Sequence, residues 1–419
     1  MKKIFALSAV IIFCLQSSAL FSQVNWFQQN SSTAANLWAI QFLDANNGYA
    51  CGDAGTVVKT TDGGLVWTAV NINTTNPVRD IFFVNANEGW AAVGDENNST
   101  ASGEIWHTTD GGLSWTQQTP STTEARFGVS MASSAAGWVV GSRNGPINID
   151  ATVNGGGAWT NQSDNNIFGW LYKIDALSTS TAFAIGGAFF PAVTGFIIKT
   201  VNGGSTWTQN NTGTIPFLSG LDMADANTGF AAGDAGTILA TTNGGAAWTA
   251  QTSGTSDTLQ DISFVSASTG WTCGYNGTIR RTTDGGTNWT GETSGIAEAL
   301  NGIFALDTTT VWAAGGSGII IRRALGIGIN EGNNISADAI IVHPNPARTE
   351  MNFDLSPFNG SGESCSLKIY DLFGKELFKT ENITERNFIF NAALLSEGLY
   401  FYVVRKGSKN LFAGKIAVQ

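Results

Sequence analysis

A ten-residue phrase that recurs six times constrains the fold of this chain more than any other feature. The first copy, Lys59–Thr68, reads KTTDGGLVWT and ends with Trp67 and a threonine. The tryptophans of the six copies follow one another at intervals of 41 to 48 residues: Trp67, Trp115, Trp159, Trp207, Trp248 and Trp289. Trp26 precedes Trp67 by 41 residues and keeps the same phase. Such a period indicates a repeat architecture in which each copy is one structural unit.

Each copy of the repeat reads as four short strands. In the first copy, runs rich in Val, Ile, Thr and aromatic residues are separated by Asn, Asp and Gly, which are strand and turn signals. A Gly followed by an aromatic residue, as in Gly48-Tyr49, marks the second strand of most copies. Seven such units in series predict an all-β chain with a seven-bladed β-propeller over residues 23–323.

The phase of the markers also predicts how the ring closes. The seventh unit has three strands and then ends, whereas Val24–Gln29 matches the fourth-strand phrase of the other units. We therefore expect the N-terminal strand to complete the last blade, which would remove two open sheet edges.

Composition separates the two ends of the chain from the repeats. All fourteen tryptophans lie between Trp26 and Trp312, so residues 340–419 form a separate domain after a glycine-containing linker at 324–339. Residues 1–22 combine Lys2 and Lys3 with a short apolar stretch, as a cleaved signal peptide does, and no transmembrane segment is expected after cleavage. Three cysteines remain in the mature chain, and no disulfide is expected.

The charge balance excludes several partners. The net charge is −11, and no basic run is present, which argues against nucleic acid or an anionic membrane. The two histidines, His107 and His343, lie in different domains, so we predict neither a metal site nor a cofactor.

The repeated phrase, Thr60-x-Asp62-x-Gly64-x-x-Trp67 in its first copy, resembles the Asp-box of sialidases and of photosystem II assembly and stability factor-like propellers. An Asp or Asn at this place accepts backbone hydrogen bonds in a turn, and three copies carry Asn, which an acid or a metal site would not tolerate. The six side chains are predicted to be structural: Asp62, Asp110, Asn154, Asn202, Asn243 and Asp284.

Ligand-binding candidates are expected on the opposite face, where the copies differ. The entrances of the seven first strands, near the central channel, carry Trp38, Arg79, Phe127, Tyr172, Ser219, Gln260 and Asn301, with Arg126 and Trp170 beside them. Longer loops in units two to four add Glu96, Arg143, Phe189 and Phe190. Mixed aromatic, amide and charged groups on a loop face suit a glycan or a peptide; solvated loops of differing length are the alternative.

The resemblance to photosystem II assembly factor-like propellers covers residues 24–323 and implies a binding protein without enzymatic activity. Some members carry Arg-x-Ile at their first-strand starts, and here only Arg79-Asp80-Ile81 fits, which argues against a photosynthetic role. The alternative is a surface glycoside hydrolase. A sialidase needs three arginines and a Tyr nucleophile; three arginines and Tyr172 alone are possible here, and the Arg-Ile-Pro motif is absent. An inverting enzyme needs only two carboxylates, for which Asp80 and Asp261 form the best pair.

The C-terminal segment resembles the type A sorting domain of the type IX secretion system of Bacteroidetes. The matching residues are Pro344, Asn345 and Pro346 at its start, Gly374 and Gly398 at turns, and Lys415 in the terminal strand. The physical pattern is that of a small antiparallel β-sandwich. The resemblance implies partners in the secretion machinery and a sorting peptidase, and a mature protein that is secreted through the periplasm or held at the outer cell surface. We therefore expect a secreted, non-enzymatic binding or adhesion propeller whose ligand is an extracellular glycan or protein.

Overall fold

The computed structural model describes residues 24–95, 103–142, 146–188, 194–210, 215–325, 341–355, 364–371, 376–406 and 409–419. Val24–Leu325 form one compact unit, and the described residues from 341 onward belong to a second. Several predicted features lie outside the described residues: the signal peptide, linker residues 326–339, Glu96, Arg143, Phe189, Phe190 and Gly374.

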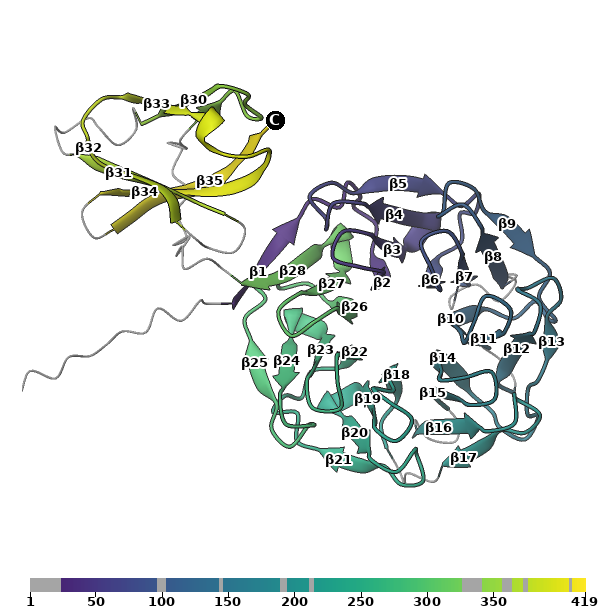
Figure 1. Ribbon diagram of the computed structural model, residues 1–419. Helices are drawn as coiled ribbons and strands as arrows, with labels where there is room; N and C mark the ends of the chain where they lie inside the picture. Colours follow the sequence, from purple (N-terminus) through teal and green to yellow (C-terminus); the bar gives the residue numbers. More distant parts are fainter. Residues whose placement is uncertain are drawn as a thin grey trace, which may run out of the picture. The chain divides into compact units, whose positions relative to one another are not determined.

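Within the described part of Val24–Leu325, seven antiparallel sheets of four strands surround a central axis (Figure 1). The first strand of each blade lies nearest the axis and the fourth at the rim. The seven-bladed β-propeller predicted from the repeat is therefore confirmed.

The first three blades follow the repeat in sequence. Blade 1 comprises β2 (Leu37–Phe42), β3 (Gly48–Gly52), the 3-10 turn η1 (Asp53–Gly55), β4 (Thr56–Thr60) and β5 (Thr68–Asn71). Blade 2 comprises β6 (Val78–Phe83), β7 (Gly89–Val93), β8 (Glu104–Thr108) and β9 (Thr116–Gln118). Blade 3 comprises β10 (Arg126–Met131), β11 (Gly137–Gly141), β12 (Asn148–Thr152) and β13 (Thr160–Asn161).

The next three blades repeat this order. Blade 4 comprises β14 (Trp170–Ala176), β15 (Ala182–Ala188), β16 (Thr194–Thr200) and β17 (Thr208–Asn210). Blade 5 comprises β18 (Leu218–Asp222), β19 (Gly229–Gly233), η2 (Asp234–Gly236), β20 (Ile238–Thr241) and β21 (Thr249–Gln251). Blade 6 comprises β22 (Leu259–Phe264), β23 (Gly270–Gly274), η3 (Tyr275–Gly277), β24 (Ile279–Thr282) and β25 (Thr290–Glu292).

Blade 7 joins the two ends of the propeller. It contains β26 (Leu300–Ala305), β27 (Val311–Gly315), η4 (Gly316–Gly318) and β28 (Ile320–Leu325), and its fourth strand is β1 (Val24–Gln29). β1 pairs antiparallel with β28, with Val24 opposite Leu325 and Gln29 opposite Ile320. The N-terminal strand thus occupies the edge that the seventh repeat leaves open.

Aromatic stacking between neighbouring blades explains the two sequence markers. Trp312, on the second strand of blade 7, stacks on Phe42 at the end of the first strand of blade 1, with ring centroids 3.5 Å apart. The Asp-box Trp67 meets Phe42 edge-on at 5.8 Å. The glycine of the second marker leaves room for this ring, because a Cβ on Gly48 would lie 2.5 Å from Phe42. The same arrangement recurs in Tyr49, Phe83 and Trp115, and in Phe230, Phe264 and Trp289.

The C-terminal unit consists of two antiparallel sheets. In the described residues one sheet has the order β29-β30-β33 and the other β32-β31-β34-β35. The strands are β29 (Ile341–His343), β30 (Glu350–Asp354), β31 (Cys365–Tyr370), β32 (Glu376–Ile383), β33 (Asn387–Asn391), β34 (Gly398–Lys406) and β35 (Lys409–Val418), with η5 (Ala392–Leu394) after β33. Buried residues of both sheets, including Met351, Phe353, Leu367 and Ile416, form one core, as in the predicted sandwich.

Among the described residues, no helix has the length and apolar character needed to cross a membrane. Cys51, Cys273 and Cys365 are all buried, and burial raises the pKa of the Cys51 and Cys273 thiols.

Candidate functional site at the channel mouth

A β-bulge in every first strand places one side chain of each blade at the channel mouth. In blade 1 the pairing between β2 and β3 shifts between Leu37 and Ala39, so Trp38 is the extra residue. The same shift occurs in the other six blades around Arg79, Phe127, Tyr172, Ser219, Gln260 and Asn301. Bulges redirect side chains and are common next to functional sites. The seven residues expected at the strand entrances are therefore the bulged residues.

All seven bulged side chains line one hollow of about 250 Å³. Lys173, Phe217, Asp234, Asp261 and Tyr275 complete its lining. Asp234 and Tyr275 begin the turns η2 and η3, in the place that Asp53 holds in blade 1. The repeat phase contained a signal for these two residues, because both stand directly after a second strand, at the turn that was expected on the mouth side. Lys173 and Phe217 flank bulged positions, and no sequence marker identifies them.

Aromatic side chains form one side of the hollow. The rings of Phe127 and Tyr172 stack with centroids 5.1 Å apart, and Phe217 meets Tyr172 edge-on at 5.2 Å. The Arg79 guanidinium lies 4.4 Å from the centre of the Trp38 ring, and its Nε donates to the Gly94 carbonyl at 3.0 Å. We call Trp38, Arg79, Phe127, Tyr172 and Phe217 the aromatic wall.

Neutral polar side chains form the other side. Ser219, Gln260 and Asn301 come from blades 5, 6 and 7, and we call them the polar wall. The Asn301 Nδ2 donates to the Leu37 carbonyl at 2.8 Å. Ser219 and Gln260 line the hollow, and within the described residues their side chains make no hydrogen bond to the protein. The two walls give the mouth an apolar half and a hydrogen-bonding half.

Beneath the mouth, charged side chains connect the blades. The Lys173 ammonium lies 3.2 Å from an Asp80 carboxylate oxygen. Burial alone would lower the pKa of Lys173, but the charges of Asp80 and Asp261 outweigh it and raise this pKa above its usual value. Lys173 thus stays protonated beside two carboxylates.

Asp80 and Asp261 are the two carboxylates of the hydrolase alternative. Both accept hydrogen bonds that connect neighbouring blades. Asp80 Oδ2 accepts the Val129 N–H of blade 3, and Asp261 Oδ2 accepts the Ile303 N–H of blade 7, each at 3.1 Å. The other oxygen of each carboxylate accepts the N–H of the next residue in its own strand. Both side chains are buried, and burial raises the pKa of Asp261. These contacts assign the two carboxylates to blade joining.

A second pair of carboxylates lies deeper along the first strands. Asp175 Oδ2 accepts the Met223 N–H at 2.8 Å, and Asp222 Oδ2 accepts the Phe264 N–H. Burial, followed by the nearby charge of Asp175, raises the pKa of Asp222 to about 8. Among the described residues no cluster of His, Cys, Asp and Glu has the composition of a metal site.

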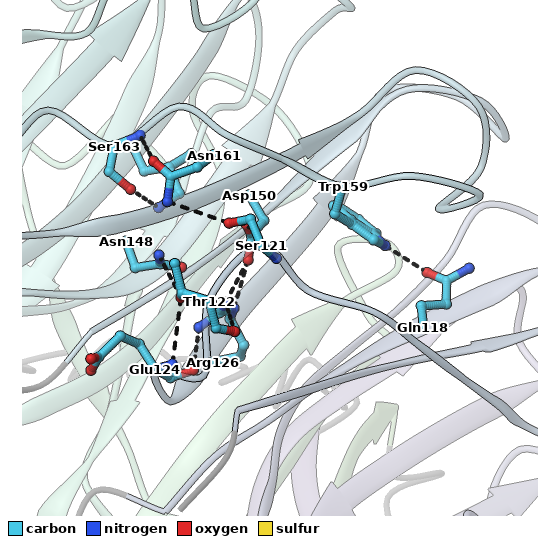
Figure 2. A network of polar contacts seen from close by, with 11 residues as sticks. Gln118, Ser121, Thr122, Glu124, Arg126, Asn148, Asp150, Trp159, Asn161 and Ser163 are labelled. Carbon is cyan, nitrogen blue, oxygen red and sulfur yellow. Dashed lines mark hydrogen bonds and ion pairs between the residues drawn. The ribbon is translucent and has the colours of Figure 1, made fainter.

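Arg126 does not reach the mouth, which corrects its place among the ligand-binding candidates. Its guanidinium is fully buried and forms an ion pair with Asp150 on β12, with 2.6 Å between Nη2 and Oδ2 (Figure 2). Nη2 also donates to the Thr122 carbonyl at 3.1 Å, and Nη1 donates to the Glu124 carbonyl. The network holds the link between blades 2 and 3 against blade 3. Sequence proximity to Phe127 was misleading, because neighbouring residues of a strand point to opposite faces.

Trp170 is not among the residues that line the mouth. Its ring is stacked at 6.0 Å from that of Tyr172. It therefore supports the aromatic wall.

The Asp-box side chains share one turn geometry. In blade 1 the Asp62 Oδ1 accepts hydrogen bonds from the Thr60 hydroxyl at 2.8 Å and the Val66 N–H at 3.0 Å. Asp110, Asn154, Asn202, Asn243 and Asp284 accept the corresponding backbone N–H groups. These turns join third to fourth strands and lie outside the lining of the mouth.

The start of the sorting motif lies against the terminal strand β35. Asn345, between Pro344 and Pro346, donates from Nδ2 to the Lys415 carbonyl at 3.0 Å and accepts the Ala417 N–H at 2.8 Å. The beginning and the end of the motif are therefore joined, while Gly398 begins β34, the strand that pairs with β35.

Two family models match parts of the chain. Residues 65–221 match the model of the photosynthesis system II assembly factor YCF48, and residues 341–419 match that of the secretion system C-terminal sorting domain. Among curated proteins, none matches the chain significantly.

Solved structures share the propeller fold at low sequence identity. YCF48 bound to D1 peptide has a TM-score of 0.57 and 19% identity, and the match covers 72% of this chain and 96% of that one. YCF48 from Cyanidioschyzon merolae has a TM-score of 0.58 and 19% identity, over 72% and 99%. The GH74 xyloglucanase from Xanthomonas campestris has a TM-score of 0.58 and 10% identity, over 80% and 60%. Because a peptide-bound protein and a xyloglucanase share this fold, the fold alone does not assign an activity.

Proposed function

We propose that this chain is an exported binding protein whose ligand enters the channel mouth. Its propeller matches the YCF48 family model over residues 65–221, and its C-terminal unit matches the secretion system C-terminal sorting domain. The observation that carries this proposal is the bulge in all seven first strands, which turns seven side chains toward one hollow. A hollow with apolar and convergent polar sides has the general composition of a ligand site.

The sorting domain implies export and contact with the secretion machinery. We propose further that a sorting peptidase cleaves between the end of β28 at Leu325 and the start of β29 at Ile341. The mature propeller would then act in adhesion or binding at the outer surface of the cell or in the medium.

The ligand is proposed to be an extracellular glycan or protein. One protein of this fold is described as bound to a peptide and another as a xyloglucanase, so the scaffold is compatible with either class. We propose binding without turnover, because the carboxylates below the mouth already hold backbone N–H groups and Lys173.

The test is a glycan and matrix-protein array with the full-length chain and two tryptophan variants. Gln260→Trp fills the polar wall, whereas Gln117→Trp places the same ring on an exposed position of β9 away from the mouth. We expect Gln260→Trp to abolish array signals that Gln117→Trp leaves unchanged. Signals that survive in Gln260→Trp would refute the mouth as the binding site.

A hydrolysis assay on the bound glycans separates the binding protein from the enzyme. We expect no release of reducing sugar. Turnover that disappears in Asp261→Asn, with binding retained, would establish the hydrolase instead.

A further inference from the structure

We propose that the channel mouth recognises an uncharged sugar unit at the end of a glycan chain, an inference that rests on the function proposed above. Three properties of the mouth support this proposal. Its charged side chains already have partners within the protein, its two walls differ in polarity, and charged side chains limit its depth.

The charged groups that line the hollow already have partners within the protein. Two are cationic and two anionic, so their charges balance. Arg79 packs on Trp38 and donates to Gly94, and Lys173 is paired with Asp80. Asp261 accepts two backbone N–H groups, and Asp234 accepts the Thr258 hydroxyl at 3.2 Å. A charged ligand group would have to displace one of these contacts and would lose its own hydration, which is costly.

Three neutral polar groups that line the hollow have no hydrogen-bond partner within the described residues. They are the Ser219 hydroxyl, the Gln260 amide and the Tyr275 hydroxyl. Together they offer both donors and acceptors. Hydroxyl groups of a sugar are likewise both donors and acceptors, so they match this side without any net charge.

The opposite wall is mainly aromatic, and its ring carbons suit the other face of a sugar ring. A pyranose carries C–H groups on its faces and hydroxyls around its edge. The ring carbons of Tyr172 and Phe217 can cover such a face, while the edge reaches Gln260 across the hollow. Only a ligand unit that is apolar on one side and rich in neutral hydrogen-bonding groups on the other satisfies both walls.

The size of the hollow favours a chain end. Its volume of about 250 Å³ is below the roughly 300–1,000 Å³ of sites that enclose a drug-sized molecule. Lys173 and Asp261 line it from below, and their ion-pair and backbone contacts fix that floor. A terminal sugar unit therefore fits into the mouth, and the rest of the glycan extends over the loop face.

The test titrates the full-length chain with three sets of probes. The first contains neutral gluco-, manno-, galacto- and xylo-oligosaccharides, the second contains the same chains ending in a uronic or sialic acid, and the third is a peptide library. Each set is measured by calorimetry with the wild type, Gln260→Ala, Gln260→Trp and the control Gln117→Ala, whose glutamine is exposed on β9.

We expect at least one neutral oligosaccharide to bind. Gln260→Ala should weaken it about tenfold, the equivalent of one or two hydrogen bonds, and Gln117→Ala should not change it. A roughly tenfold rise in ionic strength should change the dissociation constant less than about twofold, because no ion pair forms.

Three outcomes overturn the proposal. Binding restricted to the acidic chains, or to peptides, and weakened by Gln260→Ala would keep the mouth as the ligand site but exclude a neutral sugar. The absence of binding by every neutral probe would exclude it as well. Saccharide binding that is indifferent to both Gln260→Ala and Gln260→Trp would place the site elsewhere and remove the proposed function too.

Discussion

The Glu292 carboxylate on β25 accepts a hydrogen bond of 3.0 Å from the indole Nε1 of Trp26 on β1, although 266 positions separate the two residues. The same carboxylate binds the buried Arg323 guanidinium on β28, with 2.9 Å between Nε and Oε2. Glu292 therefore links blade 6 to both strands of the closure in blade 7.

Loss of the Glu292 carboxylate should weaken the closure. We expect Glu292→Ala to lower the free energy of unfolding by roughly 2–4 kcal/mol, because Arg323 then stays buried without its counter-ion. Denaturant unfolding measures this loss. Glu292→Gln keeps an acceptor for Trp26, so its free energy of unfolding should fall less. Equal stability of the wild type and both variants would contradict a role in closure.

Arg126→Ala should destabilise the propeller without changing ligand affinity. Its removal leaves the Asp150 carboxylate buried and unpaired, at a cost of about 3–5 kcal/mol. The double variant Arg126→Met/Asp150→Leu removes both charges and should recover part of the loss. Reduced array binding in an Arg126 variant of wild-type stability would return this residue to the ligand site.

Asp222→Asn should change how stability depends on pH. The pKa of Asp222 is about 8 in the fold and about 4 in an unfolded chain, so the folded state holds a proton that the unfolded state has released. The contribution of Asp222 to the free energy of unfolding is therefore highest below about pH 4 and declines as the pH rises to about 8. Asparagine stays neutral and still accepts the Phe264 N–H, so the variant should be more stable than the wild type at pH 8 and above and similar at pH 4.

The control for this pH profile is Asp225→Asn. Backbone N–H groups of Asn227 and Thr228 lower the pKa of Asp225, so this carboxylate contributes stability above its unfolded pKa and loses it only in acid. A wild-type profile that remains flat between pH 4 and 8 would contradict the raised pKa of Asp222.

Asp110→Ala should lower the thermal unfolding midpoint and leave binding intact. The Ser114 hydroxyl and N–H lower the pKa of Asp110 to about 2, below its value in an unfolded chain. Its contribution is therefore present above about pH 4 and disappears as the pH falls to about 2. Asn154→Ala removes the same turn contact in blade 3. It should lower the thermal unfolding midpoint at every pH, because Asn154 does not titrate. Selective loss of binding in a fully stable Asp110→Ala protein would contradict a structural role.

Removal of Ile341–Gln419 should leave the propeller in the periplasm. The sorting domain carries the export signal in this proposal, so protease treatment of intact cells should no longer reach the truncated protein. Unchanged surface exposure would refute the assignment.

Markers that recur in most blades made the fold predictable. Trp67 and Gly48 each occupy a place set by contacts with Phe42, and equivalent contacts recur at Phe83 and Phe264. The closing strand could be located because Trp26 keeps the phase of Trp67 although it lies at the other end of the propeller.

The site was less predictable because it depends on departures from the repeat. The bulged positions could be identified by alignment of the first strands, but the bulge itself has no residue signature, since Trp38 and Ser219 share it. Arg126 and Lys173 show why the partners of charged residues could not be predicted from the sequence. Their partners, Asp150 and Asp80, are determined by strand register and by the neighbouring blade, which a single copy of the repeat does not contain.

The pairing of Val24 with Leu325 has a consequence for biosynthesis. The strand that leaves the ribosome first can enter its sheet only after the last strand has been made, roughly 300 residues later. At roughly 5–20 residues per second, this delay is on the order of 15 to 60 seconds. A product truncated before Ile320 has no partner for β1 and cannot close, so the ring distinguishes complete chains from interrupted ones.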